Sequence, residues 1–180
     1  MKKLIIISSI LFNSICSYSQ IYMTQKGVVQ FFSTTPVEDI NATSKTVGAV
    51  LNTETNDLAI QLVIKQFKFT NSLMQEHFNE NYMESEKYPK ASFTGKINEK
   101  VDYTKDGVYK VTATGKLTIH GVTKDRTIEG QVTVKSGKIT LFSEFWIATA
   151  DHNIEIPKVV FAKIAEKIKV TANIPLEPKK

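Results

Sequence analysis

The sequence is almost free of cysteine: among its 180 residues, only Cys16 carries a thiol. Cys16 follows an apolar run near the N-terminus, in a segment that we expect to be removed. Attachment of lipid to a cysteine requires a small residue before it, and Ile15 is large. Without Cys16 the chain has no disulfide to form, so the folded domain must rely on sheet pairing and on burial of apolar side chains.

No apolar run after the N-terminal segment is long enough to cross a bilayer, which needs about 20 residues. The N-terminal segment itself has Lys2 and Lys3 before an apolar run over residues 4–15, and small residues follow that run. This order is typical of a secretory signal peptide. We therefore expect residues 1–19 to be a signal peptide and residues 20–180 to form one domain, located in the periplasm or outside the cell. An uncleaved N-terminal anchor is the alternative.

A strong excess of one charge is also missing. Lysine and arginine total 23, aspartate and glutamate total 18, and the net charge of +5 falls to +3 without Lys2 and Lys3. The positive residues are spread along the chain and are not gathered with aromatic residues, as a nucleic-acid groove would require. We expect a solvated surface and no nucleic-acid partner.

Residues that perform chemistry are few. The sequence has no glycine-rich phosphate loop and no Gly-x-Ser-x-Gly turn. His77 and Glu80 would share one face of a helix and offer two metal ligands, but no third ligand follows at a useful spacing. We therefore expect a surface charge cluster there, with no metal, no cofactor and no enzymatic activity. The alternative is an enzyme with an acid–base site near Asp151 and His152, joined by His77, which requires these side chains to converge.

What the sequence does contain is alternation of apolar and polar residues with a period of two. The alternation is clearest over residues 108–119, where a shift of one residue would turn the apolar set to solvent, so the register is well specified. Ser136 and Gly137 predict a tight hairpin between two such runs. Strands are expected over residues 28–32, 40–44, 46–51, 58–67, 91–98, 108–119, 127–134, 139–147 and 166–174.

These strands follow one another without regular helices, which favours an all-β fold with antiparallel pairing. Eight strands are the number at which a closed antiparallel barrel can hold one small ligand. Closure also removes exposed strand edges. We therefore expect an eight-stranded antiparallel barrel with a short helical segment at residues 72–83, and a two-sheet sandwich is the alternative.

The strand faces expected to point inward carry large residues beside very small ones. Phe93 and Leu117 are large, whereas Gly95, Ala113 and Gly115 are small. Small inner residues either leave an apolar cavity or receive bulky neighbours from the opposite wall, because protein interiors are close-packed. The sequence leaves both possibilities open.

The helical segment places Met74, Phe78 and Tyr82 on one stripe, at positions i, i+4 and i+8. The stripe predicts either a cap that buries these side chains at one end of the barrel, or a lid whose methionine and aromatic rings touch an apolar ligand.

Two stretches resemble a known family. Residues 74–93 hold a helical segment followed by Tyr88-Pro89 and a strand toward Phe93, and residues 114–124 read Gly-x-Leu-Thr-x-x-Gly-Val-Thr from Gly115. These stretches are similar to the YceI-like family, the lipid- or polyisoprenoid-binding proteins of bacteria. The resemblance implies an extended, lipocalin-like antiparallel barrel with a long apolar pore for an isoprenoid or another long amphiphile. Many members carry an Arg-x-Asp-Phe-Gly-Ile-like stretch where this chain differs, at residues 150–157.

We therefore expect an extracytoplasmic binding or carrier protein for a polyisoprenoid, fatty acid or related amphiphile. Its partner would be an isoprenoid or other long-chain lipid, with no stable membrane insertion after removal of the signal peptide, and a homodimer is left open. A stress-response interaction module with a packed core and an exposed apolar patch is a further alternative. The residues expected to line the pore or its lid are Phe69, Leu73, Met74, Phe78, Tyr82, Phe93, Ile97, Val111, Ala113, Leu117, Leu141, Phe145, Ile168 and Val170.

Overall fold

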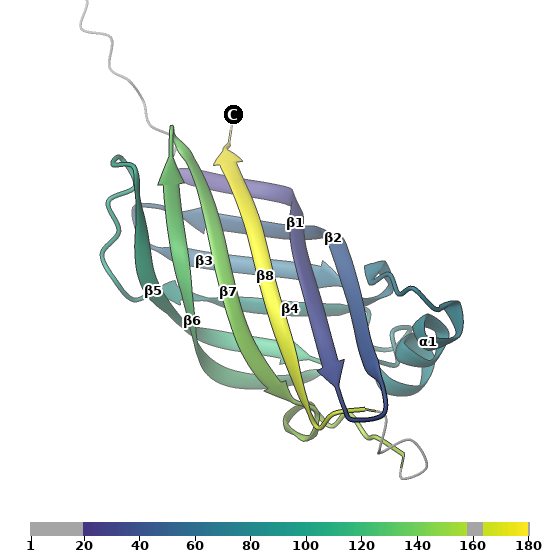
Figure 1. Ribbon diagram of the computed structural model, residues 1–180. Helices are drawn as coiled ribbons and strands as arrows, with labels where there is room; N and C mark the ends of the chain where they lie inside the picture. The colour runs from purple at the N-terminus through teal and green to yellow at the C-terminus, as the bar shows by residue number, and fades with distance from the viewer. Residues whose placement is uncertain (1–19, 158–163, 180) are drawn as a thin grey trace, which may run out of the picture.

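The computed structural model describes residues 20–157 and 164–179, and its strands form one closed antiparallel barrel (Figure 1). Each strand pairs with the next one in sequence, and the last strand pairs with the first. The all-β eight-stranded barrel is confirmed, and the two-sheet sandwich is wrong. The expected signal peptide lies outside the described residues. The strands are β1 Ile21–Thr34, β2 Asp39–Asn52, β3 Asp57–Val63, β4 Lys90–Ile97, β5 Gly107–Ile119, β6 Val122–Lys135, β7 Lys138–Ala148 and β8 Lys167–Pro178.

The two ends of the barrel differ. At one end, which we call the α1 end, the connection from β3 to β4 forms the short helix α1 (Ser72–His77) and the π-helical turn η2 (Phe78–Tyr82). A short 3-10 turn, η3 (Thr149–His152), follows β7 at the same end. The opposite end, which we call the terminal end, holds the β6–β7 hairpin and the C-terminal end of β8 (Figure 1).

The helical segment expected at residues 72–83 is present. Its start is set by Asn71, whose side-chain oxygen accepts a hydrogen bond from the backbone N–H of Leu73 at 2.9 Å. Asparagine at this position satisfies a backbone donor that has no partner within the helix. A helix as short as α1 is marginal by itself, so side-chain packing must hold it against the barrel.

Several of the expected strand boundaries are wrong, since β1 and β6 begin before residues 28 and 127. The separate strands expected at residues 40–44 and 46–51 form the single strand β2. Its pairing with β1 shifts register between Ser44 and Val47, where β2 has one extra residue. The inward face of β2 changes phase at this point, which made one strand resemble two. The strand expected over residues 58–67 ends at Val63, because the 3-10 turn η1 (Ile64–Gln66) bends the chain and buries Phe67 in the core.

The terminal half of the barrel is a packed core. Leu51, Val134, Ile139 and Leu176 are buried from solvent there. Tyr103, from the loop between β4 and β5, packs against this core. Its hydroxyl donates a hydrogen bond to the side-chain oxygen of Asn56 at 2.9 Å, and burial raises the pKa of Tyr103 to about 12. The barrel is therefore filled by side chains at this end.

Gly95 and Gly115 face each other across β4 and β5. A methyl group at Gly95 would lie 2.3 Å from the carbonyl oxygen of Thr114, and one at Gly115 would lie 2.4 Å from that of Thr94. These glycines allow two backbones to approach closely. They do not line the interior cavity, so this part of the small-residue pattern reflects close backbone contact.

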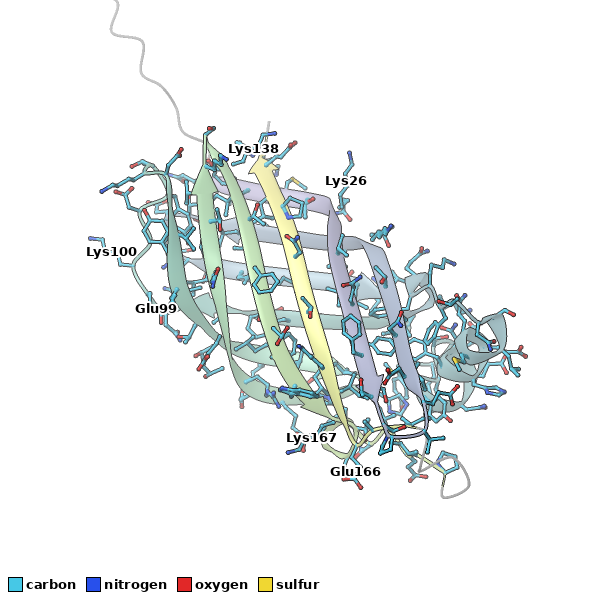
Figure 2. The ribbon with its side chains drawn as sticks, viewed as in Figure 1. Lys26, Glu99, Lys100, Lys138, Glu166 and Lys167 are labelled. Atoms are coloured by element: carbon cyan, nitrogen blue, oxygen red, sulfur yellow. The ribbon has the colours of Figure 1, made fainter. Side chains whose placement is uncertain are left out.

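Charged side chains extend outward from the barrel wall and its ends. Lys26, Glu99, Lys100, Lys138 and Lys167 are examples (Figure 2). Across the described part of the chain, no helix combines the length and the apolarity needed to cross a bilayer.

Candidate functional site

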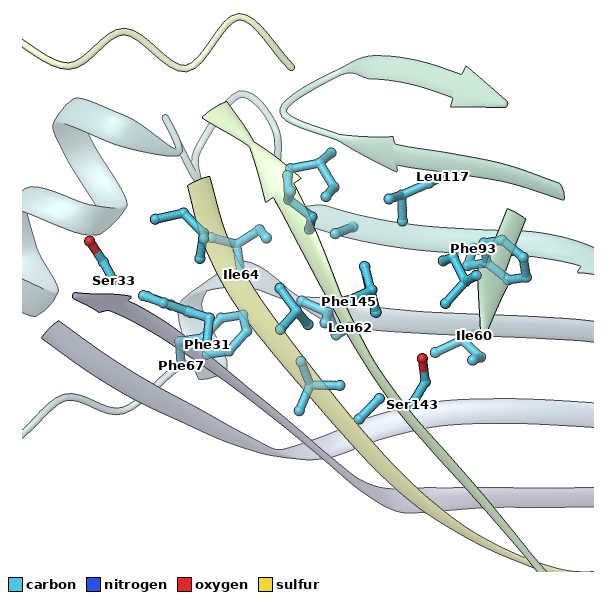
Figure 3. Close-up of a pocket in the computed structure, with 18 of the residues that line it drawn as sticks. Phe31, Ser33, Ile60, Leu62, Ile64, Phe67, Phe93, Leu117, Ser143 and Phe145 are labelled. Atoms are coloured by element: carbon cyan, nitrogen blue, oxygen red, sulfur yellow. The ribbon is translucent and has the colours of Figure 1, made fainter. Parts of the chain in front are cut away.

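The half of the barrel toward α1 encloses a cavity of about 530 Å³. This volume falls within the range typical of small-molecule sites. All eight strands contribute to its walls, and most of the side chains that line it are apolar (Figure 3). Because the terminal half is packed, the cavity ends blindly inside the barrel.

The residues expected to line a pore or lid all border this one cavity. Ala113 leaves space on β5, whereas Phe93, Leu117 and Phe145 project inward from different strands (Figure 3). Their direct contact with a ligand stays a prediction.

Several lining residues were missed by the reasoning from sequence. Ile60 and Leu62 on β3 and Phe31 on β1 lie in the cavity wall, as does Phe67 after the 3-10 turn (Figure 3). The period-two spacing of Leu58, Ile60 and Leu62 is a signal that could have identified the β3 residues. Nothing in the local pattern indicates that the chain would bend after Val63 and direct Phe67 inward.

Four phenylalanines close much of the α1 end. Phe78, which follows α1, stacks on Phe31 with 5.3 Å between ring centroids, and its ring also lies 5.7 Å from Phe67 and 5.1 Å from Phe69. Such aromatic pairs stabilise beyond their buried area. Tyr82 borders the same region, and burial raises its pKa. The segment after β3 is therefore both a cap for the barrel and a wall of the cavity.

Exposed residues, most of them polar, border the cavity at two places where it meets the surface. At the α1 end, the exposed residues Asn71 and His77 lie in its lining. On the side of the barrel, the exposed residues Glu129, Gln131 and Phe142 from β6 and β7 do so. An amphiphile in the cavity would keep its polar end near one of these places.

A second cluster surrounds the β5–β6 turn. One ring nitrogen of His120 lies 2.8 Å from a carboxylate oxygen of Glu84, and the other lies 3.1 Å from the carbonyl oxygen of His152. His152 is fully buried, and its Nδ1 lies 3.2 Å from the carbonyl oxygen of Val122. Burial lowers the pKa of His152, although the carbonyl groups of Val122 and Ile119 act in the opposite direction.

The residues of the enzyme alternative do not assemble. Asp151 approaches the sole arginine of the chain, Arg126, at 3.9 Å, whereas His77 is exposed on α1. Among the described residues, no hydrogen bond or ion pair joins Asp151, His152 and His77. Within residues 20–157 and 164–179, no group of three histidine, cysteine or acidic side chains is placed to hold a metal ion.

A comparison with protein families finds a match over most of the chain. Residues 17–176 match the family model described as the YceI-like domain. A comparison with curated proteins finds no match to this chain.

Solved structures give matches of the same kind. A polyisoprenoid-binding domain from Saccharophagus degradans superposes with a TM-score of 0.76 at 14% identity, covering 89% of this chain and 99% of that one. BcnA from Burkholderia cenocepacia has a TM-score of 0.70 at 16% identity, covering 84% and 96%. The YCEI protein of Campylobacter jejuni has a TM-score of 0.60 at 22% identity, covering 76% and 84%. At these identities the likeness concerns the barrel fold.

Proposed function

The chain belongs to the family of YceI-like domains, and on this premise we propose that it binds a long apolar chain, such as an isoprenoid or an acyl chain, inside its barrel. The protein acts as a carrier and performs no chemistry on its ligand. The observation that carries the proposal is the cavity of about 530 Å³ with its apolar walls. Protein interiors are normally close-packed, so an apolar space of this size is suited to an apolar occupant.

The energetics of burial support this choice of ligand. Each methylene group moved from water into an apolar site contributes about 0.8 kcal/mol. About ten such groups contribute about 8 kcal/mol before the costs of ordering and association are subtracted. An apolar chain can therefore bind without a strong polar contact, and the shape and length of the cavity would set which chains fit.

The comparisons add support of a different kind. The matching domain from Saccharophagus degradans is named as a polyisoprenoid-binding domain. An isoprenoid is accordingly the first ligand to test, with an acyl chain second.

We place this activity outside the cytoplasm. The support is the N-terminal pattern of Lys2 and Lys3 followed by an apolar run, which is typical of exported proteins. Fractionation of cells expressing the full chain tests this location: recovery of the protein only with cytoplasmic markers would reject it.

Ligand binding is tested by purifying the protein from bacterial cells and identifying extracted lipids by mass spectrometry. The informative variant is Ala113→Phe, which adds a ring inside the cavity, and its matched control is Val108→Phe, which adds the same ring at an exposed position on the same strand. We expect the unmodified protein and Val108→Phe to carry a long-chain lipid, and Ala113→Phe to carry much less. Circular dichroism confirms that each variant is folded. Absence of lipid from all folded samples, or equal amounts in both variants, would reject the proposal.

A further inference from the structure

We propose that the apolar chain passes in and out through the side of the barrel, by way of a gap between β6 and β7. We call this gap the side portal and define it by Glu129 and Gly130 on β6 and Phe142 and Ser143 on β7. The inference rests on the proposed function and adds the route that the ligand takes.

The first support is the pairing of the two strands. β6 pairs with β7 only from Gly130–Ser143 to Lys135–Lys138. Residues 122–129 of β6 and residues 144–148 of β7 are therefore not paired with each other. Over these same stretches β6 remains paired with β5, and β7 remains paired with β8. Both strands therefore keep their regular structure through pairing with β5 and β8. The gap lies between two strands that are each part of the sheet on their other side.

The second support is the path of the cavity. Its lining includes Gly130 together with the adjacent residue Glu129, and Ser143 together with the adjacent residue Phe142. Adjacent residues in a strand point to opposite faces. A space bordered by both members of each pair therefore continues from the inside of the barrel to its outer surface.

The third support is the way in which backbone groups at the gap are satisfied. The Ser143 hydroxyl donates a hydrogen bond to the carbonyl oxygen of Glu129 at 2.7 Å. The Arg126 side chain crosses from β6 and donates to the carbonyl oxygen of Trp146 at 2.7 Å. Side chains supply partners to these two exposed backbone carbonyls in place of a strand ladder. Both hydrogen bonds cross the gap, so an apolar chain either passes between them or displaces the side chains of Ser143 and Arg126.

The rim of the gap also suits a passing apolar chain. Phe142 and Trp146 lie on the outer face of β7 and are 41% and 55% exposed, which is unusual for rings of this size. Gly130 lacks a side chain at the point where the strands part, and a methyl group there would lie 2.6 Å from the carbonyl oxygen of Phe142. The backbones of β6 and β7 therefore approach each other closely at Gly130, immediately beside the point where the two strands separate.

Two other boundaries of the cavity are closed by packed side chains. The terminal end is filled by packed side chains such as Leu51 and Leu176. At the α1 end, Phe78 lies in contact with the rings of Phe31 and Phe69, so a chain passing there must separate these rings. Passage between β6 and β7 instead displaces polar side-chain contacts at the surface, those of Ser143 and Arg126.

The test closes the side portal with a disulfide. Glu129 and Glu144 are the first residues beyond the end of the ladder, and Glu129→Cys with Glu144→Cys, in a chain also carrying Cys16→Ser, would join the strands on their outer face. The control pair is Thr133→Cys with Thr140→Cys, which are already opposite each other inside the ladder. The probe is a pyrene-labelled long-chain alcohol, and energy transfer from Trp146, the sole tryptophan, reports its uptake and release.

We expect oxidation of the portal pair to slow uptake and release by similar factors, about tenfold or more, because closing a gate changes both rates and leaves the equilibrium nearly unchanged. Reduction of the same sample should restore the original rates, and the control pair should have no effect. Unchanged rates in the oxidised portal pair would overturn the side portal. Failure of the unmodified protein to bind the probe or a lipid extract would count against the proposed function as well.

A second measurement separates the two openings without relying on disulfide formation. Ser143→Cys and Leu73→Cys are each alkylated with a bulky maleimide in the Cys16→Ser chain, one at the side portal and one at the α1 end. Slower exchange of the pyrene probe only at the alkylated Ser143 position supports the portal. Slowing only at the Leu73 position, or equal slowing at both, overturns it.

Discussion

Single residues explain why two separated stretches of sequence carry the family resemblance. Tyr88 comes from the first stretch, and His120 and Gly121 come from the second. The rings of Tyr88 and His120 pack edge to face with 4.5 Å between centroids. Gly121 lies beneath Tyr88 with a backbone φ of +73°. The two stretches therefore meet at one contact that closes the β5–β6 turn onto the segment after α1.

This contact predicts a large effect for Gly121→Ala. A methyl group at Gly121 would lie 2.5 Å from the Tyr88 ring, and the positive φ adds backbone strain. Gly137→Ala is the matched control, because Gly137 has a φ of +74° with nothing within 4 Å. We expect Gly137→Ala to lower the free energy of unfolding by about 1 kcal/mol through strain alone. Gly121→Ala should lower it by about 1–3 kcal/mol more through steric overlap.

Urea unfolding of both variants measures the difference. If the two glycine variants lose the same free energy of unfolding, Tyr88 does not constrain the turn as the structure indicates.

Another residue-scale prediction concerns pH. Burial holds the pKa of His152 below its ordinary value, opposed by the carbonyl groups of Val122 and Ile119 and by Asp151, whereas Arg126 acts in the same direction as burial. The neutral ring is therefore favoured in the folded state, while the unfolded chain takes up a proton below about pH 6.5. The contribution of His152 to stability is present above about pH 6.5 and is lost as the pH falls toward its folded-state pKa.

The slope of this loss is at most about 1.4 kcal/mol per pH unit for one proton. Urea unfolding between mildly acidic and neutral pH measures it. We expect His152→Gln to be less stable at neutral pH and to show a flatter pH dependence than the unmodified chain. An identical pH profile for His152→Gln and the unmodified chain would show that another group dominates.

At the scale of secondary-structure elements, sequence alone could predict the strands whose inner and outer faces differ throughout. β5 is the clearest case, since its alternation matches burial from Val111 to Leu117. Alternation fails as a guide where a bulge shifts the register, as in β2, or where the chain bends, as after Val63. The helical segment was predictable because Met74, Phe78 and Tyr82 repeat with a helical period.

The element that closes the α1 end should depend on Phe78. The Phe78 ring contacts Phe31, Phe67 and Phe69, whereas Leu73 on α1 is 56% exposed. We expect Phe78→Ala to cost about 2 kcal/mol of stability and to increase amide hydrogen exchange across α1, because the helix loses its main attachment. Leu73→Ala should change stability by less than about 0.5 kcal/mol. Unchanged exchange across α1 in Phe78→Ala would show that other contacts hold the helix.

At the scale of the whole molecule, the barrel is divided into a packed half and a hollow half. The sequence could predict a barrel and name residues of its interior, but it could not assign them to one half or the other. Leu51 and Leu117 occupy similar positions in the alternating pattern, yet only Leu117 borders the cavity. In β6 the apolar alternation ends at Ile128, because the next positions of the same phase are Arg126 and Lys124. This break does not indicate that β6 parts from β7 there while it stays paired with β5. Both features depend on contacts between strands rather than on the pattern within one strand.

This division can be measured with one matched pair of substitutions. Leu51 is 0% exposed in the packed half, and Leu117 is 6% exposed at the cavity wall. We expect Leu51→Ala to cost about 3–4 kcal/mol, because a tightly surrounded site loses many contacts. Leu117→Ala should cost about 1–2 kcal/mol in the empty protein, because one side of Leu117 already lacks neighbours.

The order of the two variants should reverse when stabilisation by a long-chain alcohol is measured. Leu51→Ala loses more stability than Leu117→Ala in the empty protein, but Leu117→Ala should gain less from the ligand. A ligand that binds only the folded state raises the melting temperature according to its affinity. We expect this increase to be preserved in Leu51→Ala and reduced in Leu117→Ala, since only Leu117 borders the space that the ligand would fill. Melting curves with and without the alcohol provide the measurement. Equal ligand stabilisation of both variants would mean that the apolar chain binds somewhere other than this cavity, whatever the stability of the barrel itself.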